Sequence, residues 1–344
     1  MKEMPDMTIY EDPSYADGPV TISNHLLEID KRASIEAVLD GLTSDRKYIS
    51  SKYFYDAEGS RLFEEITRLP EYYLTRTEKA ILRDAAFRIA GDLGNIDITE
   101  IGSGDGDKVS LLLDAVPAAN MPTVRYIPLD INRGVIENSA KNLIGRFPGL
   151  RVIGMVADFE KQLHLIPGDA ERLICFFGST VGNLSRMHAM KIIAELGGGM
   201  RPGDRLLLGV DRVKNRDVLY KAYNDSRDTT ARFNRNILNV INNLAGTNFN
   251  PDLFDHIAFY EEEHSRIEMH LKAVQYMEVS CPYLHGSIRI KPDETIHTEN
   301  SHKFTARHIE NLASAAGLKI EHIFSDQKQW FSLVQFLKTD RSDR

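Results

Sequence analysis

The sequence predicts an α/β protein: a mostly parallel β-sheet covered by helices on both faces, with an antiparallel last strand, and a second α+β domain contributed by other parts of the chain. Three observations lead to this prediction. Short apolar runs alternate with helical segments from residue 96 to residue 210. The alternation stops after Asp211, where a long amphipathic stretch begins. Two strand-like stretches then close the chain.

The parallel strands are expected at the short apolar runs, because strands of a sheet covered on both faces are buried on both sides. Helices are expected between them, where apolar residues recur every three or four positions. A repeated strand, helix, strand order is typical of a parallel sheet. The expected strands are residues 96–101, 124–129, 152–157, 172–177 and 205–210, and the expected helices are 108–115, 133–147 and 187–200.

The flanking regions have a different pattern. Residues 22–93 are mostly helical in periodicity, and residues 217–243 fit one long amphipathic helix. Later elements are strands at 268–279 and 283–290, a helix at 305–316, and an antiparallel strand pair at 319–324 and 330–337. We therefore predict a flexible N-terminal arm (1–20), a substrate-binding or lid domain (21–75 and 214–302) and a sheet domain that binds the cofactor (76–213 and 303–344).

The composition disfavours several classes of protein. The chain has 344 residues, with 42 Lys or Arg and 50 Asp or Glu, so its net charge is −8. Because an acidic chain lacks the positive charge that binds phosphate backbones, nucleic acid is not an expected partner. No apolar run reaches the ~18–20 residues of a membrane-spanning helix, and the acidic start lacks a signal-peptide core. With two cysteines, Cys175 and Cys281, we expect no disulfide framework and a cytoplasmic protein.

The sharpest local motif is a glycine-rich loop between the first expected strand and a helix. It is Glu100-Ile101-Gly102-Ser103-Gly104-Asp105-Gly106-Asp107-Lys108. Glycines let the backbone turn tightly and approach a ligand closely. The dinucleotide fingerprint needs a third glycine at the position of Asp107, and a Walker-type loop needs Gly-Lys-Ser/Thr. Both are absent, which disfavours NAD, FAD and nucleoside triphosphates.

The pattern acidic-x-Gly-x-Gly-x-Gly instead resembles the first motif of class I S-adenosylmethionine-dependent methyltransferases, whose fold is a Rossmann-like sheet. Their methyl donor has no phosphates, and its cationic sulfonium and amino groups suit an acidic surrounding. The resemblance implies that Gly102, Gly104 and Lys108 bind this methyl donor.

Acidic residues at the ends of the next two strands fit the same ligand. A carboxylate at Asp130 can accept both ribose hydroxyl protons. Asp158 can bind an adenine amino group while Phe159 covers the adenine ring. The structural alternative is that the glycine loop is a tight turn and the aspartates are helix N-caps.

A further set of segments makes a more specific match. The segments are residues 52–64, residues 69–78, Gly178-Ser179-Thr180-Val181-Gly182-Asn183, Tyr223-Asn224-Asp225, Arg266-Ile267-Glu268-Met269 and Thr298-Glu299-Asn300-Ser301-His302-Lys303-Phe304. In this order they resemble the histidine Nα-methyltransferases of ergothioneine biosynthesis, from about Ile22 to the C-terminus. The resemblance implies transfer of three methyl groups in turn from S-adenosylmethionine to the α-amino group of L-histidine, which gives hercynine.

The resemblance also assigns residues to the substrate. It places Asn183 and Tyr223 on the carboxylate of histidine. It makes Glu299 and Ser301 the pair that sets specificity. Because alternating residues of an extended segment point the same way, these two could bracket the nitrogens of the imidazole, beside an apolar wall formed by Met269. Around the amine it places Tyr72, the backbone of Gly178, Phe63 and Tyr55, with Tyr55 and Tyr72 as catalytic residues and Tyr55 also touching the methyl donor.

Three alternatives remain at this point. Taken singly, each aromatic is more typical of a core, Asn183 of a turn, and Glu299 of a solvated loop. The enzyme could methylate another amine, such as that of a tryptophan derivative, or the chain could bind S-adenosylmethionine without catalysis. The eleven histidines form no His-Glu-x-x-His motif, so we predict no metal, and we expect a monomer whose partner is L-histidine.

Overall fold

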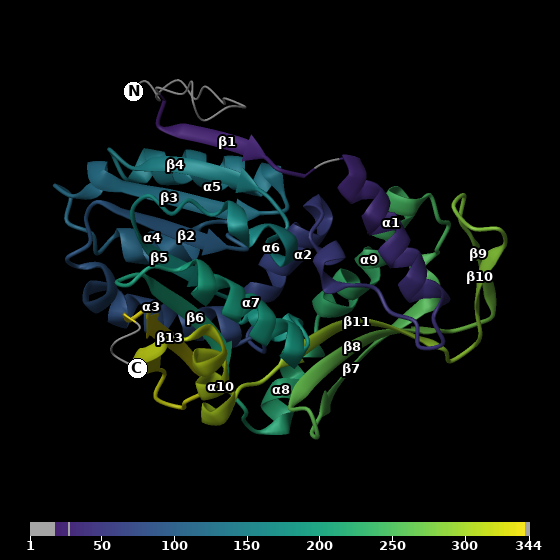
Figure 1. Ribbon diagram of the computed structural model, residues 1–344. Helices are drawn as coiled ribbons and strands as arrows, with labels where there is room; N and C mark the ends of the chain where they lie inside the picture. The colour runs from purple at the N-terminus through teal and green to yellow at the C-terminus, as the bar shows by residue number, and fades with distance from the viewer. Residues whose placement is uncertain (1–17, 27, 341–344) are drawn as a thin grey trace. The chain divides into compact units, whose positions relative to one another are not determined.

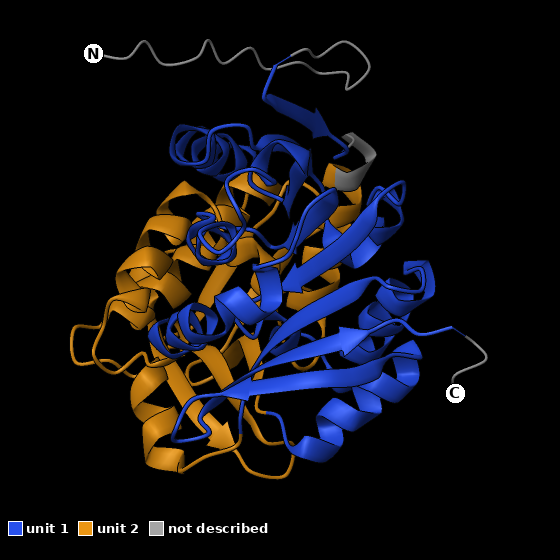
Figure 2. Ribbon diagram, turned by 90° about the vertical axis from the view of Figure 1, so that its left-hand side faces the viewer, with its two compact units in different colours: residues 1–26, 76–212, 304–344 blue, residues 27–75, 213–303 orange. Residues whose placement is uncertain are grey.

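The computed structural model describes residues 18–26 and 28–340. Of the predicted flexible arm at residues 1–20, residues 1–17 lie outside the described part of the chain. The chain forms two compact units, which Figure 2 shows in different colours. Unit 1 contains Met1–Leu26, Arg76–Arg212 and Phe304–Arg344, and unit 2 contains Leu27–Thr75 and Val213–Lys303.

Unit 1 is built on an eight-stranded sheet with the strand order β1-β4-β3-β2-β5-β6-β13-β12 (Figure 1). The strands from β1 to β6 in this order pair in parallel, whereas β13 pairs antiparallel with both β6 and β12. The predicted parallel sheet with an antiparallel end is therefore confirmed. The strands are β1 (Val20–Asn24), β2 (Ile96–Ile101), β3 (Val124–Asp130), β4 (Arg151–Val156), β5 (Glu171–Phe176), β6 (Arg205–Asp211), β12 (Lys319–Ser325) and β13 (Phe331–Leu337).

Helices cover both faces of this sheet, and each face has its own apolar core. One core joins the sheet to α3 (Leu74–Ala90), α4 (Asp107–Leu113) and α5 (Arg133–Arg146), and the other joins it to α7 (Arg186–Gly199) and α10 (Ala306–Ala316). Within β5, Cys175 packs in the first core while Ile174 and Phe176 pack in the second. The strand is buried on both sides, which is why Leu173–Phe176 are all apolar.

The first strand corrects a prediction. Residues 20–24 form the edge strand β1, paired with β4, whereas the sequence reading placed residues from 22 onward in a helical region and residues from 21 onward in the second domain. Val20, Thr21 and Ile22 are β-branched, which favours extended backbone. Val20 and Ile22 are each 1% exposed in the core of unit 1.

Unit 2 combines helices with two antiparallel sheets. Its three-stranded sheet has the order β11-β8-β7, and β9 pairs with β10. Along β8 every second residue is buried, so one side of that strand faces a core. The elements are α1 (Glu28–Thr43), α2 (Ala57–Thr67), α8 (Arg216–Tyr223), α9 (Thr229–Ala245), β7 (Phe254–Glu261), β8 (Arg266–Ala273), β9 (Met277–Ser280), β10 (Ser287–Ile290) and β11 (Thr295–His302).

The long helix predicted at residues 217–243 is wrong, because the structure has two helices there, α8 and α9. The carboxylate of Asp225 accepts hydrogen bonds from the backbone N–H groups of Thr229 and Thr230, at 3.0 and 2.7 Å. Asp228 has a positive φ of 54°. A side chain that bonds the backbone in this way competes with helical hydrogen bonds, and here it starts a new helix instead.

The strands of unit 2 also differ from the prediction. The stretch predicted as one strand at residues 268–279 is divided between β8 and β9, and β7 and β11 were not predicted. Among the described residues, no helix is both long enough and apolar enough to cross a bilayer.

Candidate active site

The glycine-rich loop of unit 1 turns sharply between β2 and α4. Gly102, Gly104 and Gly106 have φ values of 63°, 55° and 74°, in the left-handed region that favours glycine. The N–H of Gly102 donates to the carbonyl of Leu129 at 2.8 Å, which ties the loop to the end of the neighbouring strand β3. The loop therefore lies at the carboxyl ends of the parallel strands, where open α/β sheets bind ligands.

Glu100, the first acid of the loop motif, is buried beneath it. Glu100 is only 2% exposed, and its Oε2 accepts a hydrogen bond from the Tyr126 hydroxyl at 2.7 Å. Burial raises the pKa of Glu100 to about 8, although the hydrogen bond from Tyr126 opposes the shift. Glu100 is therefore mostly protonated at neutral pH, and it supports the loop without adding a full negative charge.

Asp130 and Asp158 end β3 and follow β4 at the same edge of the sheet. Asp130 accepts a hydrogen bond from the N–H of Gly104 at 3.1 Å and one from Asn132 at 2.9 Å, and burial raises its pKa. Asp158 accepts the N–H of Glu160 at 3.0 Å and thereby caps the short helix α6 (Phe159–Gln162). Asp158 therefore is a helix N-cap, as the structural alternative predicted. It also lies at the edge of the sheet where the strands end and ligands bind.

Glu78 of α3 is a functional candidate that the sequence reading missed. It is fully buried, it forms an ion pair with Lys108 at 2.9 Å, and it accepts the N–H of Gly178 at 2.9 Å. A Cβ added at Gly209 would stand 2.1 Å from its Oε1, so only glycine leaves room for this carboxylate. Glu78 thus holds both a predicted donor-binding residue, Lys108, and a predicted substrate residue, Gly178.

The segment after β5 presents the remaining predicted residues of unit 1. Gly178 has a φ of 77°, and Ser179 is also left-handed with a φ of 57°. The hydroxyl of Ser179 accepts the N–H of Asp211 at 2.9 Å, which ties this turn to the end of β6. Because the N–H of Gly178 donates to Glu78, the backbone carbonyl of Gly178 is the group of this residue suited to accept a hydrogen bond from an amine N–H. Asn183 ends the following turn of 3₁₀ helix, Thr180–Asn183, and is half-buried.

Unit 2 brings four of the predicted substrate residues into one aromatic cluster. The ring centroids of Tyr55 and Phe63 are 5.7 Å apart, those of Phe63 and Tyr72 6.2 Å, and those of Tyr72 and Tyr223 6.3 Å. These edge-to-face contacts are favourable for aromatic pairs. Phe233 of α9, which the sequence reading did not assign to the site, packs within 6.0 Å of both Tyr55 and Phe63.

A polar group adjoins this cluster at Tyr223. The hydroxyl of Tyr223 donates to the Ser301 hydroxyl at 2.7 Å, and the ammonium of Lys303 donates to both, at 3.1 and 2.8 Å. Glu299 precedes Ser301 by two residues on β11, and it is 8% exposed. Burial raises the pKa of Glu299 to about 7, while the charge of Lys303 lowers it. Met269 pairs with Glu299 across the sheet and is buried, as the predicted apolar wall requires.

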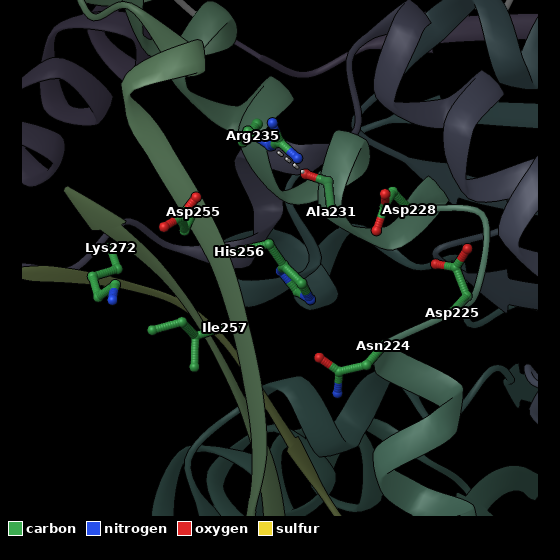
Figure 3. A pocket seen from close by; sticks show the side chains of 9 residues that line it. All are labelled: Asn224, Asp225, Asp228, Ala231, Arg235, Asp255, His256, Ile257 and Lys272. Carbon is green, nitrogen blue, oxygen red and sulfur yellow. Dashed lines mark hydrogen bonds between the residues drawn. The ribbon is translucent and has the colours of Figure 1, made fainter. Parts of the chain in front are cut away.

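The backbone carbonyl of Tyr223 accepts a hydrogen bond from a neutral histidine, His256. Asn234 donates to Nδ1 of His256 at 2.8 Å, so Nε2 carries the proton and donates to the backbone carbonyl of Tyr223 at 2.9 Å. Burial lowers the pKa of His256, which favours the neutral ring. His256 also lines a cavity of about 530 Å³ with Asp225, Asp228 and Asp255 (Figure 3). The residues predicted to bind substrate do not line this cavity.

Two groups of described side chains in unit 2 have the composition of a metal site, and the less exposed of them is Glu268, His270 and His297. Ligand atoms of Glu268, His270 and His297 lie within 4.8 Å of one another. Glu268 is already engaged, because it accepts hydrogen bonds from Arg266 at 2.8 Å and from His270 at 2.9 Å. These contacts account for the carboxylate without an ion, and the absence of a metal stays a prediction.

Comparisons with known proteins show which family the chain belongs to. A family model described as "Histidine-specific methyltransferase, SAM-dependent" matches residues 34–338. The chain is 39% identical to the histidine N-alpha-methyltransferase of Mycolicibacterium smegmatis, over 85% of this chain and 91% of that protein. It is 37% identical to that of Mycobacterium tuberculosis, over 91% of this chain and 98% of that protein.

More distant relatives include ergothioneine biosynthesis protein 1 of Schizosaccharomyces pombe, at 26% identity over 85% of this chain and 39% of that protein. A solved S-adenosylmethionine-dependent methyltransferase from Clostridium acetobutylicum superposes with a TM-score of 0.41 at 12% identity, over 91% of this chain and 99% of that one.

The sheet, its glycine loop and the family match define an S-adenosylmethionine-dependent methyltransferase. Within that class, the chain belongs to the family of histidine-specific methyltransferases.

Proposed function

We propose that this enzyme transfers three methyl groups in succession from S-adenosylmethionine to the α-amino group of L-histidine. The products are hercynine, which is Nα,Nα,Nα-trimethylhistidine, and three molecules of S-adenosylhomocysteine. The family and the names of the relatives support this substrate. The relative named for ergothioneine biosynthesis supports a place at the start of that pathway.

One observation carries the choice of histidine. Glu299 and Ser301 are buried polar residues on one side of β11, and the residues paired with them on β8, Met269 and Ile267, are buried and apolar. A polar pair within an apolar surface suits a small ring that has polar nitrogens at separate positions. An indole ring would leave one of the two polar groups unpaired, which is costly in a buried site.

The methyl donor supplies an electrophilic methyl group on its sulfonium. We assign Gly102 and Gly104 to its backbone contacts, Asp130 to its ribose, and Asp158 with Phe159 to its adenine. The mixed charge of this edge fits the ligand, because Glu100 is mostly neutral while Asp130 and Asp158 remain acceptors for hydroxyl and amino groups.

At the amine, the residues of the chain position and desolvate the nucleophile. Holding two reactants in the reactive geometry can contribute roughly 7–11 kcal/mol to lowering the barrier. Since an ordinary α-amino group has a pKa of about 8, its deprotonation is a small cost at neutral pH. We assign the Gly178 carbonyl to orienting an amine N–H and Asn183 to the carboxylate. We assign Tyr72 and Tyr55, both in the aromatic cluster, to passing the proton to water.

A substrate screen tests the proposal. The protein is incubated with S-adenosylmethionine and each of the twenty amino acids, and products are identified by mass. We expect histidine alone to gain three methyl groups at a substantial rate. Mono- or dimethylhistidine as the final product under excess methyl donor would refute trimethylation, and preferential methylation of tryptophan would refute the substrate.

A matched pair of variants tests the specificity residues. Glu299→Ala is expected to lower kcat/KM for histidine by roughly 100-fold, because the ring loses a buried hydrogen-bond partner. It should also relax selectivity toward aromatic amino acids. Glu268→Ala, on the neighbouring strand, is the control, and histidine kinetics unchanged in Glu299→Ala would contradict the assignment.

A further inference from the structure

Lys303 is a fully buried cation that has no role in the proposed methyl transfer itself. It is 0% exposed and follows directly after β11. Its backbone N–H donates to the backbone carbonyl of Ser265 at 2.7 Å. In extended backbone, residues two apart point to the same side. Glu299, Ser301 and Lys303 therefore share one side of this segment. Buried lysines are rare unless paired, so the position of this ammonium needs a reason.

The hydrogen bonds of Ser301 supply that reason. Its oxygen accepts one hydrogen bond from the Tyr223 hydroxyl at 2.7 Å and a second from the Lys303 ammonium at 2.8 Å. A serine hydroxyl has two acceptor positions and one hydrogen. Both acceptor positions of the Ser301 hydroxyl are filled, and no group among the described residues accepts its hydrogen. Ser301 can therefore act toward a ligand only as a donor.

The surroundings of Ser301 leave this role unchanged. Opposite Ser301 and Glu299 on β8 stand Ile267 and Met269, which are 0% and 2% exposed and offer no polar side-chain partner. The charged and titratable groups that contact the hydroxyl are Lys303 from its own segment and Tyr223 from α8, and the charge of Lys303 also acts on Glu299. The side of β11 thus presents a donor, Ser301, two residues from a carboxyl acceptor, Glu299.

We propose that Lys303 is a positioning residue that, with Tyr223, fixes the Ser301 hydroxyl as a donor, so that the site binds the neutral imidazole ring in one tautomer. This inference rests on the proposed function, because the ring belongs to histidine. One ring nitrogen then carries a lone pair and accepts from Ser301, and the other carries a hydrogen and donates to Glu299. An imidazolium ring, with hydrogens on both nitrogens, would meet the hydroxyl donor to donor.

The protonation of the bound ring can be observed directly. L-Histidine labelled with ¹⁵N in the ring is bound to the unmodified protein at pH 8 with S-adenosylhomocysteine, which prevents turnover. We expect separate resonances for one N–H nitrogen and one lone-pair nitrogen, where free histidine shows tautomer-averaged values. Two protonated nitrogens, or averaged values in the bound state, would overturn this inference alone. If labelled histidine does not bind and no methylated histidine forms, the proposed function itself fails.

A double-mutant cycle tests whether Lys303 acts through Ser301. Lys303→Met preserves the length of the side chain and removes its donors. We expect the KM for histidine to rise roughly tenfold and kcat to change less than about threefold, because a hydrogen-bond restraint on the bound ring is lost. In a Ser301→Ala background the same change should raise KM less than about twofold further.

Equal effects of Lys303→Met in both backgrounds would assign the lysine a general structural role and overturn the proposal. Binding of S-adenosylhomocysteine reports whether each variant is folded. Should Lys303→Met fail to fold, the ¹⁵N experiment on the unmodified protein decides the question by itself.

Discussion

Glu78 offers the sharpest test of how unit 1 is held together. Glu78→Gln leaves an oxygen to accept the N–H of Gly178 but removes the charge that pairs with Lys108, 2.9 Å away. Breaking a fully buried ion pair by neutralising one partner costs about 3–5 kcal/mol. The Lys108 side chain is 21% exposed, so water compensates part of its lost partner. We therefore expect a loss of about 2 kcal/mol in the free energy of unfolding.

The loss is measurable as a thermal midpoint. For a unit of this size, about 2 kcal/mol corresponds to a decrease in Tm of roughly 4–8 °C. The matched control is Asp107→Asn, which breaks the Lys79–Asp107 pair, where the Asp107 side chain is 62% exposed. An exposed pair contributes about 0–1 kcal/mol. Equal Tm values for Glu78→Gln and the unmodified protein would refute the argument, and so would an equal decrease in the control.

Further predictions concern pH, capping and packing. Folded Glu100 keeps its proton up to a pH of about 8, whereas its ordinary pKa is 4.5, so the folded state binds more protons and loses stability as pH rises across this window. Glu100→Gln should remove up to about 3 kcal/mol of that variation, measured by urea unfolding at pH 5 and pH 8; an unchanged pH dependence would contradict it. Asp225→Ala removes the carboxylate that accepts two backbone N–H groups at the start of α9. It should destabilise unit 2 by about 1–2 kcal/mol, measured by urea unfolding with Asp252→Ala as the control. Phe233→Leu should raise the KM for histidine several-fold by loosening the aromatic cluster, and unchanged histidine kinetics would exclude a role for that ring.

Much of unit 1 could be predicted because its strands have a strong local signal. β5 contains the apolar run Leu173–Phe176 and β2 places Ile96, Ile98 and Ile101 in buried positions, since both faces of the sheet are covered, and the predicted bounds lie within one residue of the observed ones. The glycine loop was equally readable, because left-handed backbone needs glycine at specific positions. The edge strand β1 was missed, because five residues between a turn-rich segment and a helical region carry little periodicity.

The substrate side was readable only through its resemblance to a family. No periodic pattern marks Thr295–His302 as a strand, because several of its residues, among them Thr298, Glu299 and Ser301, are polar and yet buried. A polar residue is stable inside a protein when distant parts of the chain satisfy it. Thr298 is satisfied by Asn234, 64 positions away, and Ser301 by Tyr223, 78 positions away.

The sequence by itself determined the sheet, the loop at its edge and, through its motifs, the family of the enzyme. Only the tertiary structure decided which buried groups hold those motifs in place. Glu78 looks like an ordinary helix residue until its carboxylate meets Lys108 and the backbone of Gly178, 100 positions away. In the sequence Lys303 resembles a surface lysine, whereas in the structure its ammonium donates hydrogen bonds to the hydroxyls of Tyr223 and Ser301. Hydrogen bonds and charges act over a few ångströms in space, and the spacing of residues along a chain does not encode which of them will meet.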